Sequence, residues 1–129
     1  LREFPTAMPS QKQLRHGDYM SIIVNLYYTG KNGAAKRFAE EMESSGIANA
    51  IRQEEGNEKY EYFFSMSDPE TVLLIDSWRD QEAIDFHHAS PMMDTIARLR
   101  EKYDLHMRME RYLSDDDGVP AKDDNFIRK

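Results

Sequence analysis

Hydrophobic and polar positions in the first half of this chain predict a strand followed by helical segments. Residues 21–28 (SIIVNLYY) are rich in β-branched and aromatic side chains and are followed by glycines, so they are predicted to form a strand. Ala34, Phe38 and Met42 then recur at the spacing of one helix face. Gly46 interrupts that helix, and the apolar residues after it indicate a further short helical turn.

The second half of the pattern begins with two more strands. Residues 59–65 (KYEYFFS) and 71–78 (TVLLIDSW) read as strands joined by a polar turn that contains a proline. The second of them is almost continuously apolar, which is typical of a strand buried on both faces. Asp80 then has the side chain of a helix N-cap, and we expect a helix from there through His88.

A last helix and a last strand complete the pattern. Ser90 and Pro91 predict that the helix restarts, with the serine as its cap and the proline in its first turn. Leu105, Met107 and Met109 alternate with polar residues, which predicts a strand with one buried face.

The resulting order, β-α-β-β-α-β, is that of a ferredoxin-like split βαβ domain in the α+β class. Such a sheet carries helices on one face only. Its other face is also apolar here, because both alternating sets of positions in the first and third strands contain Ile, Val or Leu. The simplest cover is the same face of a second copy, so we expect a homodimer.

The 129 residues favour one domain, which we place at residues 20–113. Residues 1–19 show no lasting periodicity and are interpreted as an N-terminal arm or an expression remnant. Residues 114–129 are interpreted as a C-terminal tail. No apolar run reaches the roughly 20 residues of a membrane helix, and no signal peptide is visible, so we expect a soluble, cytoplasmic protein without membrane contact.

Composition narrows the possible chemistry. A net charge of −7 with scattered basic residues argues against nucleic acid as a partner. The chain has no cysteine, which excludes disulfides and thiolate chemistry. His16, His87, His88 and His106 lack the spacing of metal ligands, so no metal site is predicted.

Two segments resemble a known family. Residues 55–60 (EGNEKY) are similar to the glycine turn and strand of antibiotic-biosynthesis-monooxygenase domains, and residues 76–90 (DSWRDQEAIDFHHAS) to that family's tryptophan-to-histidine stretch. Asn25 corresponds to an asparagine that many members carry on the first strand. The resemblance implies a dimeric α+β barrel with a pocket between sheet and helices. In several members this pocket lets oxygen attack a phenol or quinol without flavin, haem or metal.

Two departures from the family pattern matter. Met92 stands where relatives often have a histidine. The haem-degrading branch of the family has an aromatic residue in place of His87 and an iron-ligating histidine near the position of Ala97. Neither feature is present, so haem is not expected, and we predict that no cofactor is needed.

The resemblance and the residue chemistry together predict a catalytic set. His87 is the expected base, because a pKa of about 6.5 suits proton abstraction near neutrality. Asn25 is expected to hold a substrate oxygen, and Trp78 to stack on an aromatic ring. The expected substrate-binding residues are Tyr60, Tyr62, His88 and Met92.

Each of these residues also has a structural interpretation. His87 lies where a histidine can simply cap or pack a helix end, and His88 points about 100° away from it, nearer the surface or the dimer interface. Asn25 can bond the backbone, and Trp78 can be plain packing. Asp76 is expected either to orient His87 or, as the favoured role, to form an ion pair with an arginine such as Arg52 or Arg108.

The predicted function is a cofactor-independent monooxygenase that uses molecular oxygen on a small aromatic phenol or quinol. Two alternatives remain open. One is an isomerase of a small signalling or sugar-like metabolite in the same pocket. The other is a non-catalytic dimeric module for ligand binding or stress response, which a pocket filled with side chains would favour.

Overall fold

Strands and helices alternate in the predicted order in the computed structural model, which describes residues 20–129. The elements are β1 (Ile22–Thr29), α1 (Ala34–Ser44), α2 (Ile47–Arg52), β2 (Asn57–Phe64), β3 (Thr71–Trp78), α3 (Gln81–His88), α4 (Met92–Lys102) and β4 (His106–Leu113). A 3₁₀ helix, η3 (Ala121–Phe126), follows and buries none of its residues. The α+β ferredoxin-like fold is confirmed, and the arm predicted for residues 1–19 lies outside the described residues.

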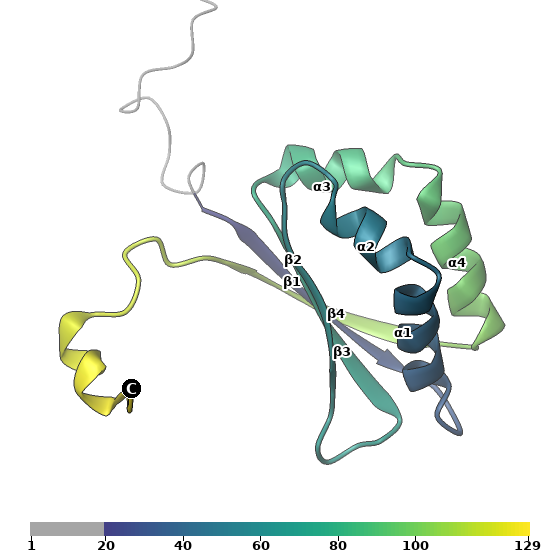
Figure 1. The fold of residues 1–129 in the computed structure, drawn as a ribbon, viewed down its shortest axis with the longest axis horizontal. Coiled ribbons are helices and arrows are strands. Elements are labelled where there is room, and N and C mark those ends of the chain that lie inside the picture. The colour runs from purple at the N-terminus through teal and green to yellow at the C-terminus, as the bar shows by residue number, and fades with distance from the viewer. Residues whose placement is uncertain (1–19) are drawn as a thin grey trace, which may run out of the picture.

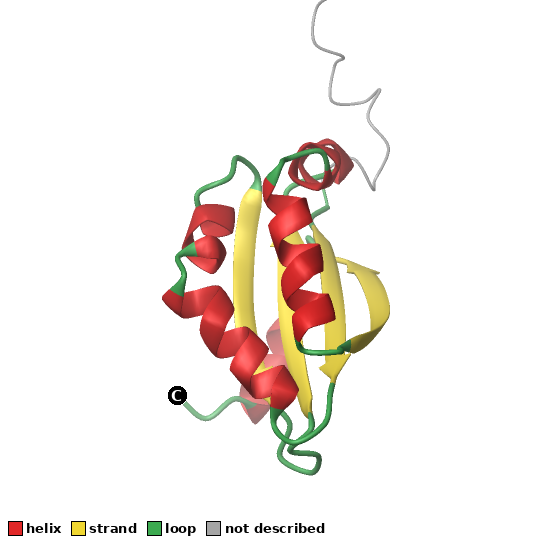
Figure 2. Cartoon of the chain, turned by 90° about the vertical axis from the view of Figure 1, so that its right-hand side faces the viewer, coloured by secondary structure: helices red, strands yellow, loops and turns green. Residues whose placement is uncertain are grey.

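The four strands form one sheet in the order β2-β3-β1-β4, and all neighbouring strands are antiparallel. β1 and β3 are therefore the central strands, while β2 and β4 are the edges. Helices α1 to α4 lie together on one side of this sheet (Figure 1), and Figure 2 shows the sheet beside them from a second direction. Within residues 20–129, no helix is both long and apolar enough to cross a lipid bilayer.

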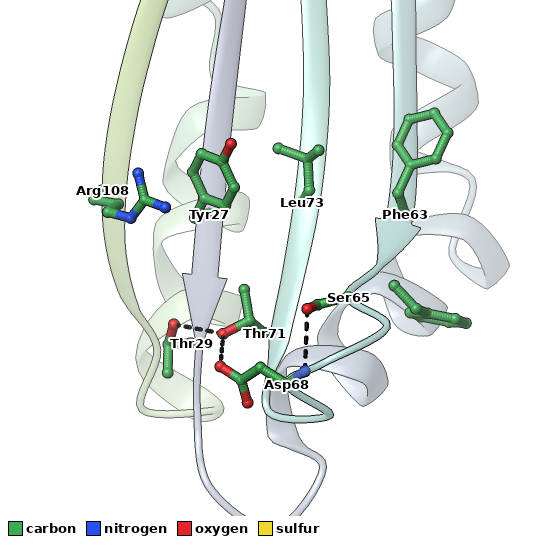
Figure 3. A pocket seen from close by; sticks show the side chains of 9 residues that line it. Tyr27, Thr29, Phe63, Ser65, Asp68, Thr71, Leu73 and Arg108 are labelled. Carbon is green, nitrogen blue, oxygen red and sulfur yellow. Dashed lines mark hydrogen bonds between the residues drawn. The ribbon is translucent and has the colours of Figure 1, made fainter.

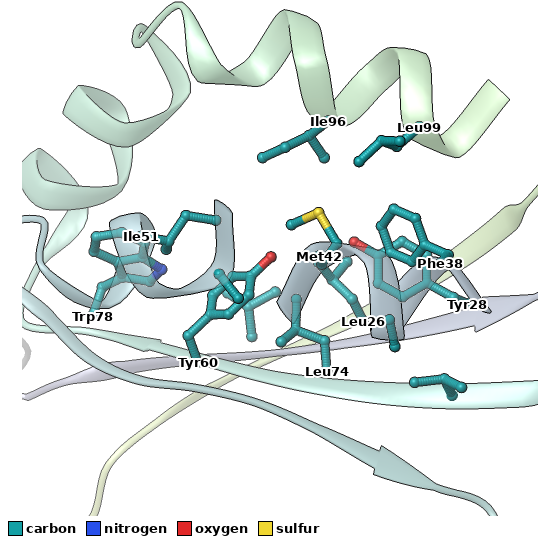
Figure 4. Close-up of a cluster of buried hydrophobic side chains, with 14 of the residues drawn as sticks. Leu26, Tyr28, Phe38, Met42, Ile51, Tyr60, Leu74, Trp78, Ile96 and Leu99 are labelled. Carbon is teal, nitrogen blue, oxygen red and sulfur yellow. The ribbon is translucent and has the colours of Figure 1, made fainter. Parts of the chain in front are cut away.

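One core fills the space between the sheet and the helices. Alternate residues of β1, from Ile22 to Tyr28, are buried there together with Leu74 of β3. The helices contribute Phe38, Met42, Ile51, Ile96 and Leu99 to the same cluster (Figure 4). The alternate side chains of the central strands and the side chains at helical spacing from Ala34 thus pack together in a single apolar layer.

The apolar face of β4 differs from the prediction. Met107 and Met109 are paired with Tyr28 and Leu26 and so lie on the helix side of the sheet, yet they are 42% and 61% exposed. The prediction of a strand with one buried face is wrong for the single chain. The physical reason is that β4 is an edge strand, beyond the part of the sheet whose residues join the core cluster.

The two predicted helix starts have different outcomes. Asp80 caps α3 as predicted, with its carboxylate accepting a hydrogen bond from the Ala83 amide at 2.9 Å. The Ser90 cap is wrong, because Pro91 occupies the position before α4 and no side chain caps it. The Ser90 hydroxyl is instead buried without a hydrogen-bond partner in the described residues.

Gly56 makes the close approach that brings the turn before β2 against α3. Its φ of +87° lies in the left-handed region, and its carbonyl accepts a hydrogen bond from the Arg79 amide at 2.7 Å. A Cβ atom placed there would lie 2.5 Å from the Cβ of Ala83. Only glycine therefore satisfies both the backbone conformation and the available space.

Gly56→Ala should lower the free energy of unfolding by about 2–4 kcal/mol, because left-handed strain and the clash with α3 add together. Gly46→Ala is the matched control, since Gly46 has the same φ of +87° but nothing within 4 Å of an added Cβ. It should cost only about 1 kcal/mol. Urea unfolding of the two variants measures the difference, and equal losses would contradict the close contact.

Candidate functional site

A buried histidine–carboxylate pair lies between the sheet and the helices. The Nδ1 atom of His87 is 2.6 Å from Oε1 of Glu54, and only 6% of the His87 side chain and 13% of the Glu54 side chain are exposed. A carboxylate at Nδ1 holds the ring proton there, which leaves Nε2 as the unprotonated nitrogen. The pair is therefore an oriented base in an apolar layer.

Local structure explains how residues 33 positions apart meet. Glu54 follows α2 immediately before the Gly56 turn, which packs on α3 next to Ala83. Ala83, Ile84 and His87 recur at intervals of one and three residues and form the buried side of α3. The turn and the buried side of the helix therefore present the carboxylate and the imidazole to each other.

Trp78 covers the histidine ring. The two ring centroids are 4.9 Å apart with an interplanar angle of 30°, and Trp78 is 1% exposed. The next residue along the helix, His88, is exposed, with its ring centroid 5.6 Å from that of His87. The family resemblance implied that Trp78 and His87 belong to one site, and the structure brings these two together while it leaves His88 outside.

A second buried polar group adjoins the pair. Asp76, two residues before Trp78 on β3, interacts electrostatically with Glu54 and with Arg100 of α4. Arg100 donates to the Tyr28 hydroxyl at 3.1 Å. Tyr60 interacts electrostatically with Tyr28, Asp76 and Arg100. Strands β1, β2 and β3 and helix α4 thus all contribute polar groups to one region.

The remaining expected contacts surround this region. The hydroxyls of Tyr60 and Tyr62 are 3.1 Å apart, and Tyr60 is buried while Tyr62 is half-buried. Figure 4 shows the hydroxyls of Tyr28 and Tyr60 turned toward each other. Met92 packs partly buried against the core at the start of α4. Tyr60 and Tyr62 thus belong to the polar region, whereas Met92 contributes apolar wall.

Burial sets the protonation of these groups. It lowers the pKa of His87 below its ordinary value, although the contact with Glu54 acts in the opposite direction. Burial also raises the pKa of Asp76 to about 7; the Trp78 side chain opposes this shift and the charge of Glu54 adds to it. Near neutrality, His87 is an uncharged base and Asp76 is close to half protonated.

Asn25 lies elsewhere. It is paired with Ile75 and Glu110, on the sheet face that points away from the helices, while its neighbours Val24 and Leu26 are in the core. The sheet therefore separates Asn25 from His87, and the two cannot line one pocket within a protomer. The expectation that Asn25 holds a substrate oxygen beside His87 finds no support in this geometry.

The expected ion pair of Asp76 is also not formed. The Arg52 guanidinium forms an ion pair with Glu43, and its Nε donates a hydrogen bond to the Tyr60 carbonyl at 2.8 Å. Arg108 is on the opposite sheet face, where it contacts Glu110 at 3.2 Å. Arg100 is instead the arginine near Asp76. Its spacing of four residues from Ile96 is a sequence signal for an inward position, whereas nothing local identifies Glu54 as the partner of His87.

The pocket expected between sheet and helices is not among the four surface cavities described for residues 20–129. None of the four is lined by His87 or Trp78. The first, of about 500 Å³, lies on the open sheet face between Tyr27, Phe63, Leu73 and Arg108 (Figure 3). Within residues 20–129, no group of three or more His, Asp or Glu side chains is placed to hold a metal ion.

Comparisons with known proteins agree on the family. The model of the family described as "Antibiotic biosynthesis monooxygenase" matches residues 21–99. A relative from Bacillus subtilis (strain 168), named "Putative monooxygenase YcnE", is 28% identical over 67 residues, which span 52% of this chain and 68% of that protein.

Solved structures share the fold. The crystal structure of a putative antibiotic biosynthesis monooxygenase from Deinococcus radiodurans has a TM-score of 0.64 at 20% identity, covering 73% of this chain and 92% of that one. A conserved protein from Bacteroides thetaiotaomicron, described as a possible oxidoreductase, has a TM-score of 0.65 at 14% identity, covering 74% and 99%. At these identities the likeness shows the fold alone.

The raised pKa of Asp76 predicts a pH-dependent stability. A carboxyl whose pKa is higher in the folded state stabilises the fold at low pH, and this contribution is lost as pH rises toward and through about 7. Asp76→Asn removes the titration while keeping the shape. The variant should be more stable than wild type at pH 8, by an amount on the order of 1–4 kcal/mol, and about equal at pH 4. Thermal unfolding at both pH values measures this, and a constant difference would contradict it.

Proposed function

The chain belongs to the antibiotic biosynthesis monooxygenase family, and from that premise we propose that it is a cofactor-independent monooxygenase of a small phenol or quinol. The observation that carries the proposal is the His87–Glu54 pair, an oriented neutral base at 2.6 Å from its carboxylate. It lies in the apolar layer against the indole of Trp78. Such a layer excludes bulk water, which would otherwise compete for the reacting groups.

The proposed reaction begins with proton transfer. His87 Nε2 removes the phenolic proton, and Glu54 stabilises the imidazolium that forms. The phenolate is a far better electron donor to oxygen than the neutral phenol. One oxygen atom then replaces a ring hydrogen as a new C–O bond, the other leaves as water, and the ring becomes a quinone. The substrate supplies all four electrons, so the balance requires no further reductant.

We propose the following roles for the other residues. Trp78 and the half-buried Tyr62 contact the aromatic ring of the substrate, and Met92 supplies apolar wall at the helix start. His88 is exposed and is placed at the entrance rather than at the reacting atoms. Because Met42, Ile51 and Ile96 fill the layer between sheet and helices, substrate binding at His87 requires side chains of this layer to rearrange.

One observation favours a second candidate function. None of the four cavities described reaches His87, and an interior filled with side chains suits a non-catalytic dimeric ligand-binding module. This candidate predicts ligand binding without oxygen uptake, so an oxygen electrode distinguishes the two.

We further propose that residues 20–113 fold as the domain and that two copies pair through the open sheet face. Ile23, Leu73 and Ile75 lie half-buried on this face, opposite the residues of β1 and β3 that fill the core. A contiguous apolar face that is open to solvent is typical of an interaction surface. The same pairing would cover the cavity beside Tyr27 and Arg108.

His87→Ala should lower turnover of an oxidised phenol by about 10²–10⁴-fold, because the general base is lost. His88→Ala is the matched control and should retain most of the activity, since its side chain is exposed. Oxygen uptake measures both variants. If His87→Ala turns over as fast as wild type, the mechanism is wrong; an inactive wild type that still binds phenols supports the binding module.

The pH profile gives a second check on the base. Burial lowers the pKa of His87, so kcat/KM should rise through a transition below the ordinary histidine value and be level at neutral pH. Glu54→Gln should reduce the rate at every pH and move that transition, because the partner of Nδ1 changes. A profile that is the same in both proteins would contradict the role of Glu54.

Dimerisation is tested by sedimentation of the full chain. The wild type should sediment at twice its mass of 15.1 kDa at micromolar concentration. Ile75→Lys, which places a charge in the middle of the open face, should shift the equilibrium to monomer. Ile127→Lys, in the exposed tail, is the control and should leave the dimer intact. A monomeric wild type would refute the pairing.

A further inference from the structure

A row of apolar side chains on β4 has no cover within residues 20–129. Met107, Met109 and Leu113 pair with buried residues of β1, so their side chains lie on the helix side of the sheet. All three are nevertheless exposed. We call these three residues the β4 strip. A row of large apolar side chains that is open to solvent is typical of an interaction surface.

The helix η3 and the residue before its cap also present apolar side chains to solvent. Val119 is 66% and Phe126 is 89% exposed, and no residue of η3 is buried. A run of six residues is long for a 3₁₀ helix, and helices this short are marginal in water without a packing partner. We therefore expect η3 to pack against an apolar surface.

Hydrogen bonds at the start of the C-terminal tail direct it away from the β4 strip. The Ser114 amide donates to the Ser21 carbonyl at 2.9 Å, and the Ser114 hydroxyl accepts from the Ser21 amide at 2.9 Å. A turn at Gly118, with φ of +70°, follows. Figure 1 and Figure 2 both show η3 beyond the sheet, on the side away from helices α1 to α4. The tail of one chain therefore lies on the side where we propose that the second copy pairs, opposite to its own β4 strip.

The charges of η3 and of the β4 strip are complementary. Arg111 lies between Met109 and Leu113 on the same side of β4 and forms no ion pair within residues 20–129. In η3, Asp123 and Phe126 are three residues apart, a spacing that places both side chains on one face of a 3₁₀ helix. Asp123 likewise has no ion pair in this part of the chain. A carboxylate beside an aromatic ring thus matches a guanidinium flanked by apolar side chains.

We propose that η3 of one copy packs on the β4 strip of a second copy, with Phe126 against Met109 and Asp123 facing Arg111. Two-fold symmetry makes the exchange reciprocal, so that each copy donates one tail and receives one. The inference rests on the proposed pairing of two copies and not on the proposed chemistry. The open sheet faces carry that pairing, and the exchanged helices add a second contact that covers an exposed edge strand.

Disulfide cross-linking of full-length chains tests the exchange, because the chain has no cysteine of its own. A chain with Met109→Cys and a chain with Phe126→Cys, each carrying a different tag, are co-expressed, purified together and oxidised mildly. They should form a covalent mixed product at about twice the 15.1 kDa of one chain. Met66→Cys replaces Met109→Cys in the matched control. Met66 is fully exposed but lies in the turn between β2 and β3, so the control should give little mixed product.

A single chain that carries both substitutions distinguishes the donor of the tail. If the tail is exchanged, oxidation of Met109→Cys/Phe126→Cys should link two chains. If η3 folds back on its own β4 strip, the disulfide closes within one chain, and the protein runs as a monomer on a non-reducing denaturing gel.

Charge reversal tests the contact between Asp123 and Arg111. Arg111→Glu in the chain with Met109→Cys should lower the yield of mixed product several-fold, because two carboxylates then face each other. Asp123→Arg in the chain with Phe126→Cys should lower it similarly. The two reversals together should restore most of the yield, which the separate loss of either side chain does not explain.

The outcomes separate this inference from the other proposals. A dimer in sedimentation that gives no mixed product, or no more than the Met66→Cys control, overturns the exchange and leaves the pairing of the sheet faces in place. A disulfide within one chain also overturns it. A monomeric wild type overturns the exchange together with the pairing. Oxygen uptake with a phenol bears on the monooxygenase alone, whichever result the cross-linking gives.

Discussion

Because helices cover only one face of the sheet, the apolar core of this protein is a single layer between that face and the helices. A polar group placed in this layer has no bulk water and is stable only with a partner from another element. His87 of α3 finds Glu54 after α2, and Arg100 of α4 finds Tyr28 of β1. The one-sided cover therefore decides where a base can be shielded from water, and it leaves the other sheet face free of helices α1 to α4.

Periodicity predicted the elements well because side-chain alternation and helical spacing record which face each residue occupies. The strand predicted at residues 71–78 has those bounds, and the strands predicted at residues 21–28 and 59–65 differ from β1 and β2 by one or two residues, since hydrogen bonding rather than side-chain type sets strand ends. Met107 and Met109 are the exception. Their alternation is that of a buried strand, but a pattern cannot tell whether anything covers the face, and β4 is an edge.

The site was predictable only where its residues are close in sequence. Trp78 and His87 are joined by one short connection, and the capping residue Asp80 fixes how α3 leaves β3. Glu54 reaches His87 through the packing of the Gly56 turn on α3, which is a tertiary contact without a local signal. The sheet face of Asn25 could not be predicted for a related reason. Whether it faces the helices depends on the register that pairs Val24 with Asp76, and register is a property of two strands together.

The open face of the sheet also contains a buried polar atom that lacks a hydrogen-bond partner within residues 20–129, which is Oδ1 of Asn25. Asn25 lies opposite Glu110 of β4, which accepts a hydrogen bond from the Tyr27 hydroxyl at 3.0 Å. A second copy that covered this face with apolar side chains alone would leave the amide oxygen unsatisfied, at a cost of about 1–3 kcal/mol. The proposed pairing of two copies would therefore require a donor or a trapped water opposite Asn25, which would make Asn25 a determinant of how the two copies align.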